Sequence, residues 1–281
     1  MPARKIAVAA LLALCLLSAC LPVARPTVKI GLVGPFEGRY RDTGYEVIYA
    51  VRLAVREANQ RGLGGYGLEL LGLDDSGDAE MAVTQAQKMG TDPQVVGVVG
   101  HWLDETTLAA APAYARAGLP LLATTPSPQL DSNAFRLWPA QSNLDAQIQP
   151  AWNRAALPFQ PGWGQTPFWS DGGPRLYLLA PAPMPADSSD PAFAERYRAI
   201  SNGVEPNAYA VLAYDAARLL CDAIVRDAAA HGRPTRGGVA VALRESSYAG
   251  LSGTFRFDAA QAWADAKTWV YEYAGGQVVK P

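Results

Sequence analysis

From residue 28 onward the chain alternates short apolar runs, rich in β-branched residues, with segments whose apolar residues recur at helical spacing. The apolar runs predict strands at residues 28–34, 68–73, 95–99 and 119–123. The segments between them predict helices at residues 43–60, 79–89 and 105–117. Strands that are apolar on both faces and separated by helices are typical of a parallel sheet covered on both sides. The alternation therefore predicts an α/β fold with a Rossmann-like parallel sheet and helices on both faces.

The pattern changes in the second half of the chain. Eight of the 22 prolines lie between Pro158 and Pro191, a spacing that excludes long helices and central strands from the expected fold. A helix is expected before this segment, around residues 143–156. After it, the spacing of apolar residues predicts helices at 191–200, 207–226 and 236–245. Strands are expected at 253–257 and 268–273, followed by a short last strand beyond Gly275 and Gly276.

The first 20 residues have the pattern of an export signal. Arg4 and Lys5 precede a short apolar core, which ends in Leu17-Ser18-Ala19-Cys20, the pattern of a bacterial lipoprotein box. We expect residues 1–19 to be removed and Cys20 to be lipidated, which would anchor the chain to a membrane surface without spanning it. The alternatives are a plain signal peptide with a chance cysteine, or an uncleaved anchor. Residues 20–27 would then form a tether.

The composition of the mature chain excludes several classes of protein. Without residues 1–19 it carries 22 basic and 26 acidic residues, a net charge near −4, and no basic patch indicates nucleic acid binding. No later apolar run approaches the roughly 20 residues of a membrane helix. Cys15 would leave with the signal and Cys20 would be modified, so Cys221 has no partner for a disulfide.

One glycine-rich stretch matches the dinucleotide fingerprint G-x-G-x-x-G. Residues 62–67 read Gly-Leu-Gly-Gly-Tyr-Gly, but they follow a predicted helix and precede a predicted strand. Nucleotide binding requires the opposite order, because the helix N-terminus must face the pyrophosphate. The stretch is therefore interpreted as a helix C-cap and a turn, and no cofactor is expected.

Residues that carry catalysis or bind metals are scarce. The chain has two histidines, His101 and His231, and no C-x-x-C, H-E-x-x-H or G-x-S-x-G motif. A metal site formed by His101, Asp104 and Glu105 stays open as an alternative, but no second set of ligands accompanies it. A catalytic triad assembled from distant residues also stays open, although no motif indicates one. Neither an enzyme nor a metal protein is therefore expected.

Loops that follow the predicted strands hold the best candidates for a binding site. In an open parallel sheet, ligands bind beyond the carboxyl ends of the strands. Three such loops offer hydroxyls, backbone amides and aromatic surface: residues 34–40, 100–107 and 124–127. In the second of them, Asp104 is expected to be the N-cap of the following helix. Together the loops predict a ligand-binding rim at one edge of the sheet.

An ordered series of segments resembles the type I periplasmic solute-binding proteins of the branched-chain amino acid (Leu/Ile/Val) family, which serve ABC importers. The resemblance covers roughly residues 28–137 and 188–280. It rests on the following segments: "VKIGLVGPFEG", "AVRLAVREANQRGLGG", "LELLGLDDSGDAEMAVTQAQKM", "VVGVVG" through "AGLPLLATTPS", "DPAFAERYRA", "PNAYAVLAYDAARLLCDAI" and "GLSGTFRFDAAQ". The family has two α/β lobes that close on a ligand, so the resemblance implies a periplasmic-binding-protein type I fold.

The resemblance also implies a set of ligand contacts. Asp104 falls where the family has a serine that holds the ligand's carboxylate, and Thr106 follows it. Thr125 and Ser127 match residues that bind the ligand through backbone and hydroxyl groups. The remaining contacts implied by position are aromatic: Phe36, Tyr40 and Tyr209. For Tyr209, packing in the core is an equally weighted alternative.

Two departures from the family pattern bear on the ligand. An aspartate at position 104 would repel a carboxylate by about 4 kcal/mol at 4 Å and an effective dielectric of 20. This favours a cationic, hydroxylated or amide-like ligand. In addition, about 50 residues, 139–188, stand where the family has several βα units of roughly 30 residues each. The second lobe is therefore expected to be reduced, with Trp163 and Trp169 either forming a partial lid or filling exposed apolar surface.

These observations lead to one functional prediction and one alternative. The predicted protein is a monomeric envelope lipoprotein that binds a small polar solute for an ABC transporter permease. Its main lobe would comprise residues 28–137 and 189–257, and its reduced lobe residues 138–188 and 258–281. The alternative is a non-transport envelope lipoprotein, a sensor, scaffold or decayed paralogue, that binds a protein partner through the main lobe.

Overall fold

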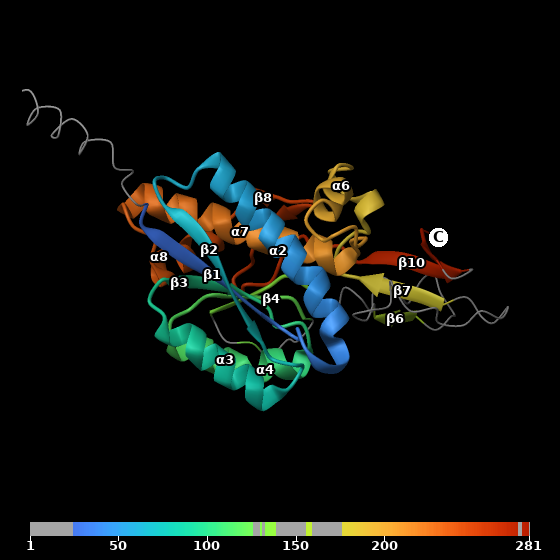
Figure 1. Ribbon diagram of the computed structural model, residues 1–281, viewed down its shortest axis with the longest axis horizontal. Helices are drawn as coiled ribbons and strands as arrows, with labels where there is room; N and C mark the ends of the chain where they lie inside the picture. Colours follow the sequence, from blue (N-terminus) through green and yellow to red (C-terminus); the bar gives the residue numbers. More distant parts are fainter. Residues whose placement is uncertain are drawn as a thin grey trace, which may run out of the picture.

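The computed structural model describes residues 25–125, 130, 133–138, 156–158, 176–274 and 277–280. Its largest sheet is parallel throughout, with strand order β2-β1-β3-β4-β5 (Figure 1). The strands are β1 (Thr27–Gly34), β2 (Gly67–Asp74), β3 (Val95–Val99), β4 (Leu121–Ala123) and β5 (Ala134–Arg136). The first four confirm the predicted strands. The three-residue β5 was not predicted, because it is too short to show a period.

Helices cover both faces of this sheet, as predicted. On one side lie α2 (Arg41–Arg61), α7 (Ala208–His231) and α8 (Arg236–Arg244), and on the other α3 (Ala79–Thr91) and α4 (Asp104–Arg116) (Figure 1). Strand β3 shows the division, since Val96 and Val99 pack with α2 and α7 whereas Val95 and Val98 pack with α3 and α4. The result is a three-layer α/β fold with a hydrophobic core on each side of the sheet.

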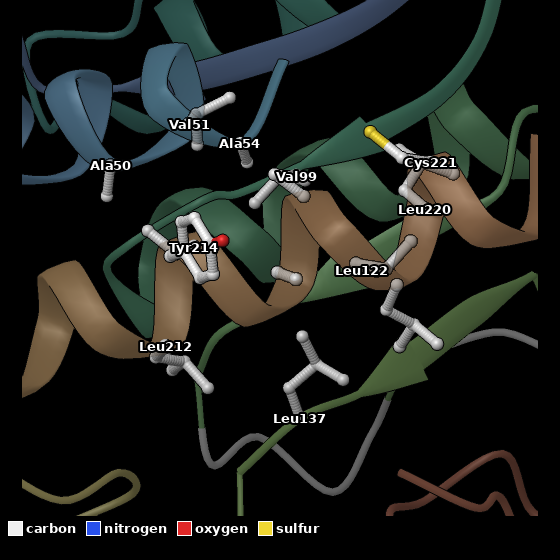
Figure 2. Packing of buried hydrophobic residues seen from close by; sticks show 14 of the residues in the cluster. Ala50, Val51, Ala54, Val99, Leu122, Leu137, Leu212, Tyr214, Leu220 and Cys221 are labelled. Carbon is white, nitrogen blue, oxygen red and sulfur yellow. The ribbon is translucent and has the colours of Figure 1, made fainter. Parts of the chain in front are cut away.

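The core between the sheet and helices α2 and α7 is built from small and branched side chains. Figure 2 shows Ala54 of α2, Val99 of β3 and Leu220 of α7 packed in this layer, with Cys221 beside them. Gly97 allows the close approach of α7, because a Cβ atom at this position would lie 2.5 Å from Leu220 Cδ1. Cys221 is a buried free thiol, and burial raises its pKa to about 12, so it acts as a small apolar residue.

A second sheet of four short strands has the order β11-β10-β7-β6. Its strands are β6 (Ala156–Pro158), β7 (Leu176–Ala180), β10 (Trp269–Ala274) and β11 (Gln277–Val279). Strand β7 is central, so the expectation that residues 158–191 hold no central strand was wrong. The five residues of β7 contain no proline, and Pro158 lies in the edge strand β6, where a missing N–H is tolerated.

Smaller elements complete the described chain. They are the 3-10 turns η1 (Gly38–Tyr40) and η2 (Pro185–Asp187), helix α6 (Phe193–Arg198), and the hairpin of β8 (Tyr248–Ala249) and β9 (Thr254–Phe255). The strand expected at 253–257 is the shorter β9, and most of the helix expected at 143–156 lies outside the described residues. Gly62 is the C-cap of α2, and the stretch leads into β2, which begins at Gly67; this confirms a helix end and a turn. The division into two lobes stays a prediction.

Arg236 at the start of α8 joins the end of the sheet to two helices. Its Nε donates to Val95 O at 3.0 Å, and its Nη1 donates to Ala117 O at 2.9 Å. Its Nη2 donates to Gly90 O at 3.1 Å and to Asp92 O at 2.7 Å. The guanidinium therefore satisfies carbonyls at the C-terminal ends of α3 and α4, where a cation is also favoured by the helix dipole.

Within the described chain, no helix is long and apolar enough to cross a membrane.

Candidate binding site at the carboxyl edge of the main sheet

Asp74, the last residue of β2, holds the loop that follows β1. Its carboxylate accepts hydrogen bonds from the backbone N–H of Phe36 at 2.7 Å and of Glu37 at 3.1 Å. It also accepts bonds from the Ser76 N–H at 3.0 Å and the Ser76 hydroxyl at 2.6 Å. Partial burial acts to raise the pKa of Asp74, but these hydrogen bonds outweigh it and keep the pKa below its usual value. The charged carboxylate thus fixes the position of Phe36.

His101 connects the loops after β2, β3 and β4. Its fully buried ring contacts Asp75 Oδ2 through Nδ1 at 2.6 Å and the Tyr114 hydroxyl through Nε2 at 3.1 Å. Its backbone carbonyl accepts the Thr124 hydroxyl at 2.6 Å. Burial and the nearby Asp75 raise the pKa of Tyr114. These contacts fix His101, which precedes Trp102 in the loop, so His101 has a positioning role.

The metal alternative is not supported by this arrangement. The His101 ring is directed at Asp75 and Tyr114, whereas Asp104 and Glu105 are exposed. Among the residues that the structure describes, no group of three or more His, Cys, Asp or Glu side chains could hold a metal ion.

Three aromatic side chains form a buried cluster at the ends of β3 and β5, and we call Trp102, Trp138 and Tyr209 the aromatic cluster. Tyr209 lies 6.0 Å from Trp102 and 6.3 Å from Trp138 between ring centroids. The exposed fractions of Trp102, Trp138 and Tyr209 are 2%, 6% and 3%. Burial raises the pKa of Tyr209, and the charges of Glu46 and Asp104 raise it further. The predicted contact Tyr209 therefore lies among aromatic rings at the expected edge of the sheet.

The first loop also approaches this cluster. A Cβ atom at Gly34 would lie 2.8 Å from Trp102 Cδ1 and 3.9 Å from Phe36 Cε1, so the two rings flank Gly34. Tyr40 lies farther along the loop, where Arg39 stacks over its ring at 5.3 Å. Tyr40 packs on the loop after β2, because a Cβ atom at Gly77 would lie 2.8 Å from its Cδ2. Phe36 thus adjoins the cluster, and Tyr40 supports the neighbouring loop.

Three buried donors at this edge lack hydrogen-bond partners within the described chain. They are the indole nitrogens of Trp102 and Trp138 and the hydroxyl of Thr125, which is 3% exposed. The residues come from the loops after β3, β5 and β4. A buried polar group without a partner costs about 1–3 kcal/mol. The three donors lie where ligands bind in open parallel sheets, beyond the carboxyl ends of the strands.

Asp104 is not the N-cap of α4, contrary to the prediction. The helix begins at Asp104 itself, and the capping position is Leu103, whose side chain makes no hydrogen bond. The hydroxyls of Thr106 and Thr107 instead donate to Leu103 O at 3.0 and 2.8 Å. The Asp104 carboxylate is exposed and still lies at the positive end of the helix dipole. Thr106 is buried, and its hydroxyl is used within this helix turn.

Glu46 is a site neighbour that the sequence reasoning missed. It is 2% exposed and accepts a hydrogen bond from Asn207 Nδ2 at 2.6 Å, while Asn207 Oδ1 caps α7 through the N–H groups of Tyr209 and Ala210. Burial raises the pKa of Glu46 to about 7, against the opposing hydrogen bond from Asn207. No sequence signal marked this residue, since it lies next to the apolar stripe of a long helix.

Trp138 was also missed. It lies two residues beyond the unpredicted strand β5, and recognising that strand would have found it. Of the other predicted site residues, Ser127, Trp163 and the lipidation residue Cys20 lie outside the described residues, as does Trp169. The structure therefore brings Phe36, Thr125 and Tyr209 to one edge of the sheet and adds Trp102, Trp138 and Glu46 to them.

Comparison with known proteins gives similarity in sequence and in fold. Residues 27–155 match the family described as "Periplasmic binding protein". Two proteins of Pseudomonas aeruginosa are similar over shorter segments: the "Amino acid binding protein" is 29% identical over 100 residues, and the "Leucine-, isoleucine-, valine-, threonine-, and alanine-binding protein" is 33% identical over 119. These segments are 35% and 41% of this chain, and 26% and 31% of the two relatives.

Solved structures match over most of the chain. The substrate-binding protein LivJ of a branched-chain amino acid transporter from Streptococcus pneumoniae, in complex with isoleucine, has a TM-score of 0.68 at 19% identity, covering 91% of this chain and 100% of that one. A solute-binding protein of an ABC transporter from R. palustris, in complex with benzoate, has a TM-score of 0.67 at 16% identity, covering 90% and 95%. These matches confirm the resemblance: the chain has the α/β fold of the type I periplasmic solute-binding proteins, and residues 27–155 carry that family's sequence pattern.

Proposed function

We propose that this chain is the substrate-binding component of an ABC importer and binds a small solute at the carboxyl edge of its main sheet. The observation that carries the proposal is the set of three buried donors without partners, on Trp102, Trp138 and Thr125, beside the aromatic cluster. Open α/β sheets bind ligands beyond the carboxyl ends of their strands, which is where these groups lie. The similarity to transporter proteins that hold isoleucine or benzoate supports a small solute.

The position of Asp104 changes what is expected of the ligand's charge. Because Asp104 is exposed, its repulsion of a carboxylate at 4 Å is closer to the value in water, about 1 kcal/mol, than to 4 kcal/mol. Asp104 alone would therefore weaken a carboxylate ligand several-fold without excluding it. In the proposed site it biases the choice of ligand, together with Glu46. Replacing Asp104 by Ser should improve binding of carboxylates relative to cations.

A melting experiment tests this proposal. The purified chain is heated with each member of a panel of amino acids, amides, polyamines and sugars, and one class should raise the melting temperature in a concentration-dependent way. Native mass spectrometry of the same preparation should show a retained solute. A flat response to every member would contradict the transport function. Pull-down from membranes would then test the alternative, an envelope lipoprotein that binds a protein partner.

Two parts of the proposal concern location and domain structure. We propose that the protein is exported to the cell envelope and anchored through lipid on Cys20, and that it serves an ABC permease as a monomer without cofactor, metal or catalysis. Metabolic labelling with palmitate should mark the chain and fail with Cys20→Ala. We also propose the reduced second lobe at residues 138–188 and 258–281, which is supported by the strands β6, β7, β10 and β11 within these ranges.

A further inference from the structure

The segment that leaves the second sheet has a stiff backbone. Residues 181–190 follow β7 and lead to α6, and we call them the connecting segment. Prolines stand at positions 181, 183 and 185. Each proline fixes its own φ angle and restricts the residue before it to extended conformations. Met184, which lies between two of them, has φ −62° and ψ 153°, and residues 181–183 are buried. The start of the connecting segment therefore has little freedom to act as a hinge.

Tyr271 bonds the connecting segment back onto the second sheet. It lies in β10, which pairs with β7, and it is 1% exposed. Its hydroxyl accepts a hydrogen bond from the Met184 N–H at 2.7 Å and donates to Asp187 Oδ2 at 3.1 Å. The Lys280 ammonium, beyond β11, lies 3.3 Å from Asp187 Oδ1. The Tyr271 hydroxyl thus both donates and accepts, and it attaches residues 184–187 to β10.

The other end of the connecting segment is attached to the main α/β layers. Ser189 donates from its N–H to Leu251 O at 3.1 Å and from its hydroxyl to Gly250 O at 3.2 Å. The turn that carries these carbonyls is held by the fully buried Asp215 of α7, which accepts from the Leu251 N–H at 2.7 Å and the Ser252 N–H at 2.8 Å. A Cβ atom at Gly250 would lie 2.7 Å from Asp215 Oδ1, so only glycine fits this close contact. Ser189 is therefore linked to α7 through one turn.

Helix α6 continues this attachment onto α2. Arg196 lies 2.8 Å from the Asp190 carboxylate through Nη2, and its Nε donates to Glu57 Oε1 at 2.9 Å. The fully buried Tyr197 donates from its hydroxyl to Glu46 O at 2.9 Å. Both glutamates belong to α2. The connecting segment is thus bonded to the second sheet at residues 184 and 187 and to the main layers at residues 189 and 190, while β7 and β10 project to one side of those layers (Figure 1).

A hinge between the two sheets would have to turn within residues 181–183, because the residues after them lead directly into the attachment to the main layers. The bonds of Tyr271 to Met184 and Asp187 cross that point. We propose that the connecting segment is a lock, in which Tyr271 holds the second sheet at a fixed angle to the main sheet. One segment attached rigidly to both sheets is enough to prevent their rotation, so the protein does not undergo the lobe closure that the resemblance implies. The inference goes beyond the proposed function and does not depend on which solute is bound.

Tyr271→Phe tests the lock in the free protein, because it removes the hydroxyl and keeps the ring. Hydrogen exchange of single amides should become at least about tenfold faster at Met184, whose acceptor is lost, and stay unchanged at Ser189, whose bond to Leu251 O remains. The control is Tyr66→Phe, which removes a hydroxyl bond to Gly232 O at 2.7 Å within the main layers and should leave both amides unchanged. Equal exchange at Met184 in the wild type and in Tyr271→Phe would overturn the inference.

Small-angle X-ray scattering measures the resulting freedom of the second sheet. A variant that combines Tyr271→Phe with Pro181→Gly and Pro183→Gly lacks both the bond and the stiff backbone. Its distribution of interatomic distances should be broader than that of the wild type, whereas Tyr66→Phe should match the wild type. A triple variant that folds and scatters like the wild type would overturn the inference.

Scattering with added solute separates the lock from the proposed function. Each member of the panel of amino acids, amides, polyamines and sugars that raises the melting temperature should leave the wild-type scattering curve unchanged. Contraction of the wild-type chain with such a solute would overturn the lock and leave the proposed function standing. If no member raises the melting temperature, the proposed function fails, and the variants of the free protein still decide the lock.

Discussion

Arg236 offers the sharpest test of how the main sheet is held together. Replacing it with Gln removes a guanidinium that donates to four backbone carbonyls, those of Gly90, Asp92, Val95 and Ala117. These carbonyls end α3 and α4 and begin β3, and within the described chain no other hydrogen bond from α8 reaches them. The substitution therefore detaches α8 from the opposite helical layer.

The magnitude follows from the geometry. A hydrogen bond to a charged group contributes about 1.5–3 kcal/mol when buried, but Arg236 is half-buried and water can replace part of what is lost. Counting two of the four bonds at about 1.5 kcal/mol each gives a loss of about 3 kcal/mol. For a chain of this size, such a loss lowers the melting temperature by about 6–12 °C.

Thermal and urea unfolding, followed by far-UV circular dichroism, would measure this loss. The matched control is Arg233→Gln, because Arg233 is exposed and makes no hydrogen bond or ion pair within the described chain. Arg236→Lys should be intermediate, since an ammonium keeps the charge but not the planar fork of donors. If Arg236→Gln unfolds within 2 °C of the control (roughly the shift expected from under 1 kcal/mol), the guanidinium does not join these layers and the reasoning is refuted.

Three further predictions concern single groups. Tyr114→Phe should cost about 1–3 kcal/mol in the free energy of unfolding, because the fully buried His101 Nε2 loses its partner. Gly97→Ala should cost about 1–3 kcal/mol, since its Cβ would lie 2.5 Å from Leu220 Cδ1. Glu46, whose pKa is raised from 4.5 to about 7, binds protons more tightly when folded, so stability should fall by about 1 kcal/mol between pH 6 and pH 8, and Glu46→Gln should abolish this part of the decline.

Each of these predictions has a comparison that can contradict it. Tyr114→Phe should be compared with Tyr45→Phe, which alters an exposed ring, and equal stabilities would show that the buried bond contributes little. Gly237→Ala is the control for Gly97→Ala, because a Cβ atom at Gly237 meets no atom within 4 Å. For Glu46, the comparison with Glu46→Gln removes the titration of Asp215, whose pKa burial raises to about 6, because both proteins contain Asp215. Parallel stability curves for wild type and Glu46→Gln would exclude the assigned titration.

Much of the fold could be predicted from the pattern of apolar residues. Strands β1 to β4 and helices α2, α3, α4 and α7 lie within a few residues of their predicted positions, because each is long or apolar enough to show its period locally. The errors have a common origin. Strand β5 has three residues, and β7 lies among prolines, so neither shows a period, and only pairing with distant strands establishes them.

The candidate binding site was predicted in part, because some of its residues lie next to elements whose period is visible in the local sequence. Thr125 follows the strand predicted at residues 119–123, and Tyr209 lies in the helix predicted at residues 207–226. Both residues lie at the expected edge of the sheet. The prediction that Asp104 is the N-cap of α4 was wrong. The helix begins one residue earlier than expected, which moves the Asp104 side chain from the capping position into the first turn. Trp138 and Glu46 became site neighbours only through α7, which follows them in the chain by more than 60 residues and carries Tyr209 to both.

The local sequence pattern is enough to predict the parallel α/β fold and the resemblance to solute-binding proteins, since strand and helix periods and glycine turns are properties of neighbouring residues. Which polar groups are satisfied depends on contacts between segments that are distant in the sequence, so it is seen only in the folded chain. Trp263 and Trp138 look alike in the sequence, yet one indole nitrogen donates to Thr254 O and the other has no partner in the described chain. The difference arises because a buried donor depends on whichever segment the fold places against it, and no described segment places an acceptor at the Trp138 indole nitrogen.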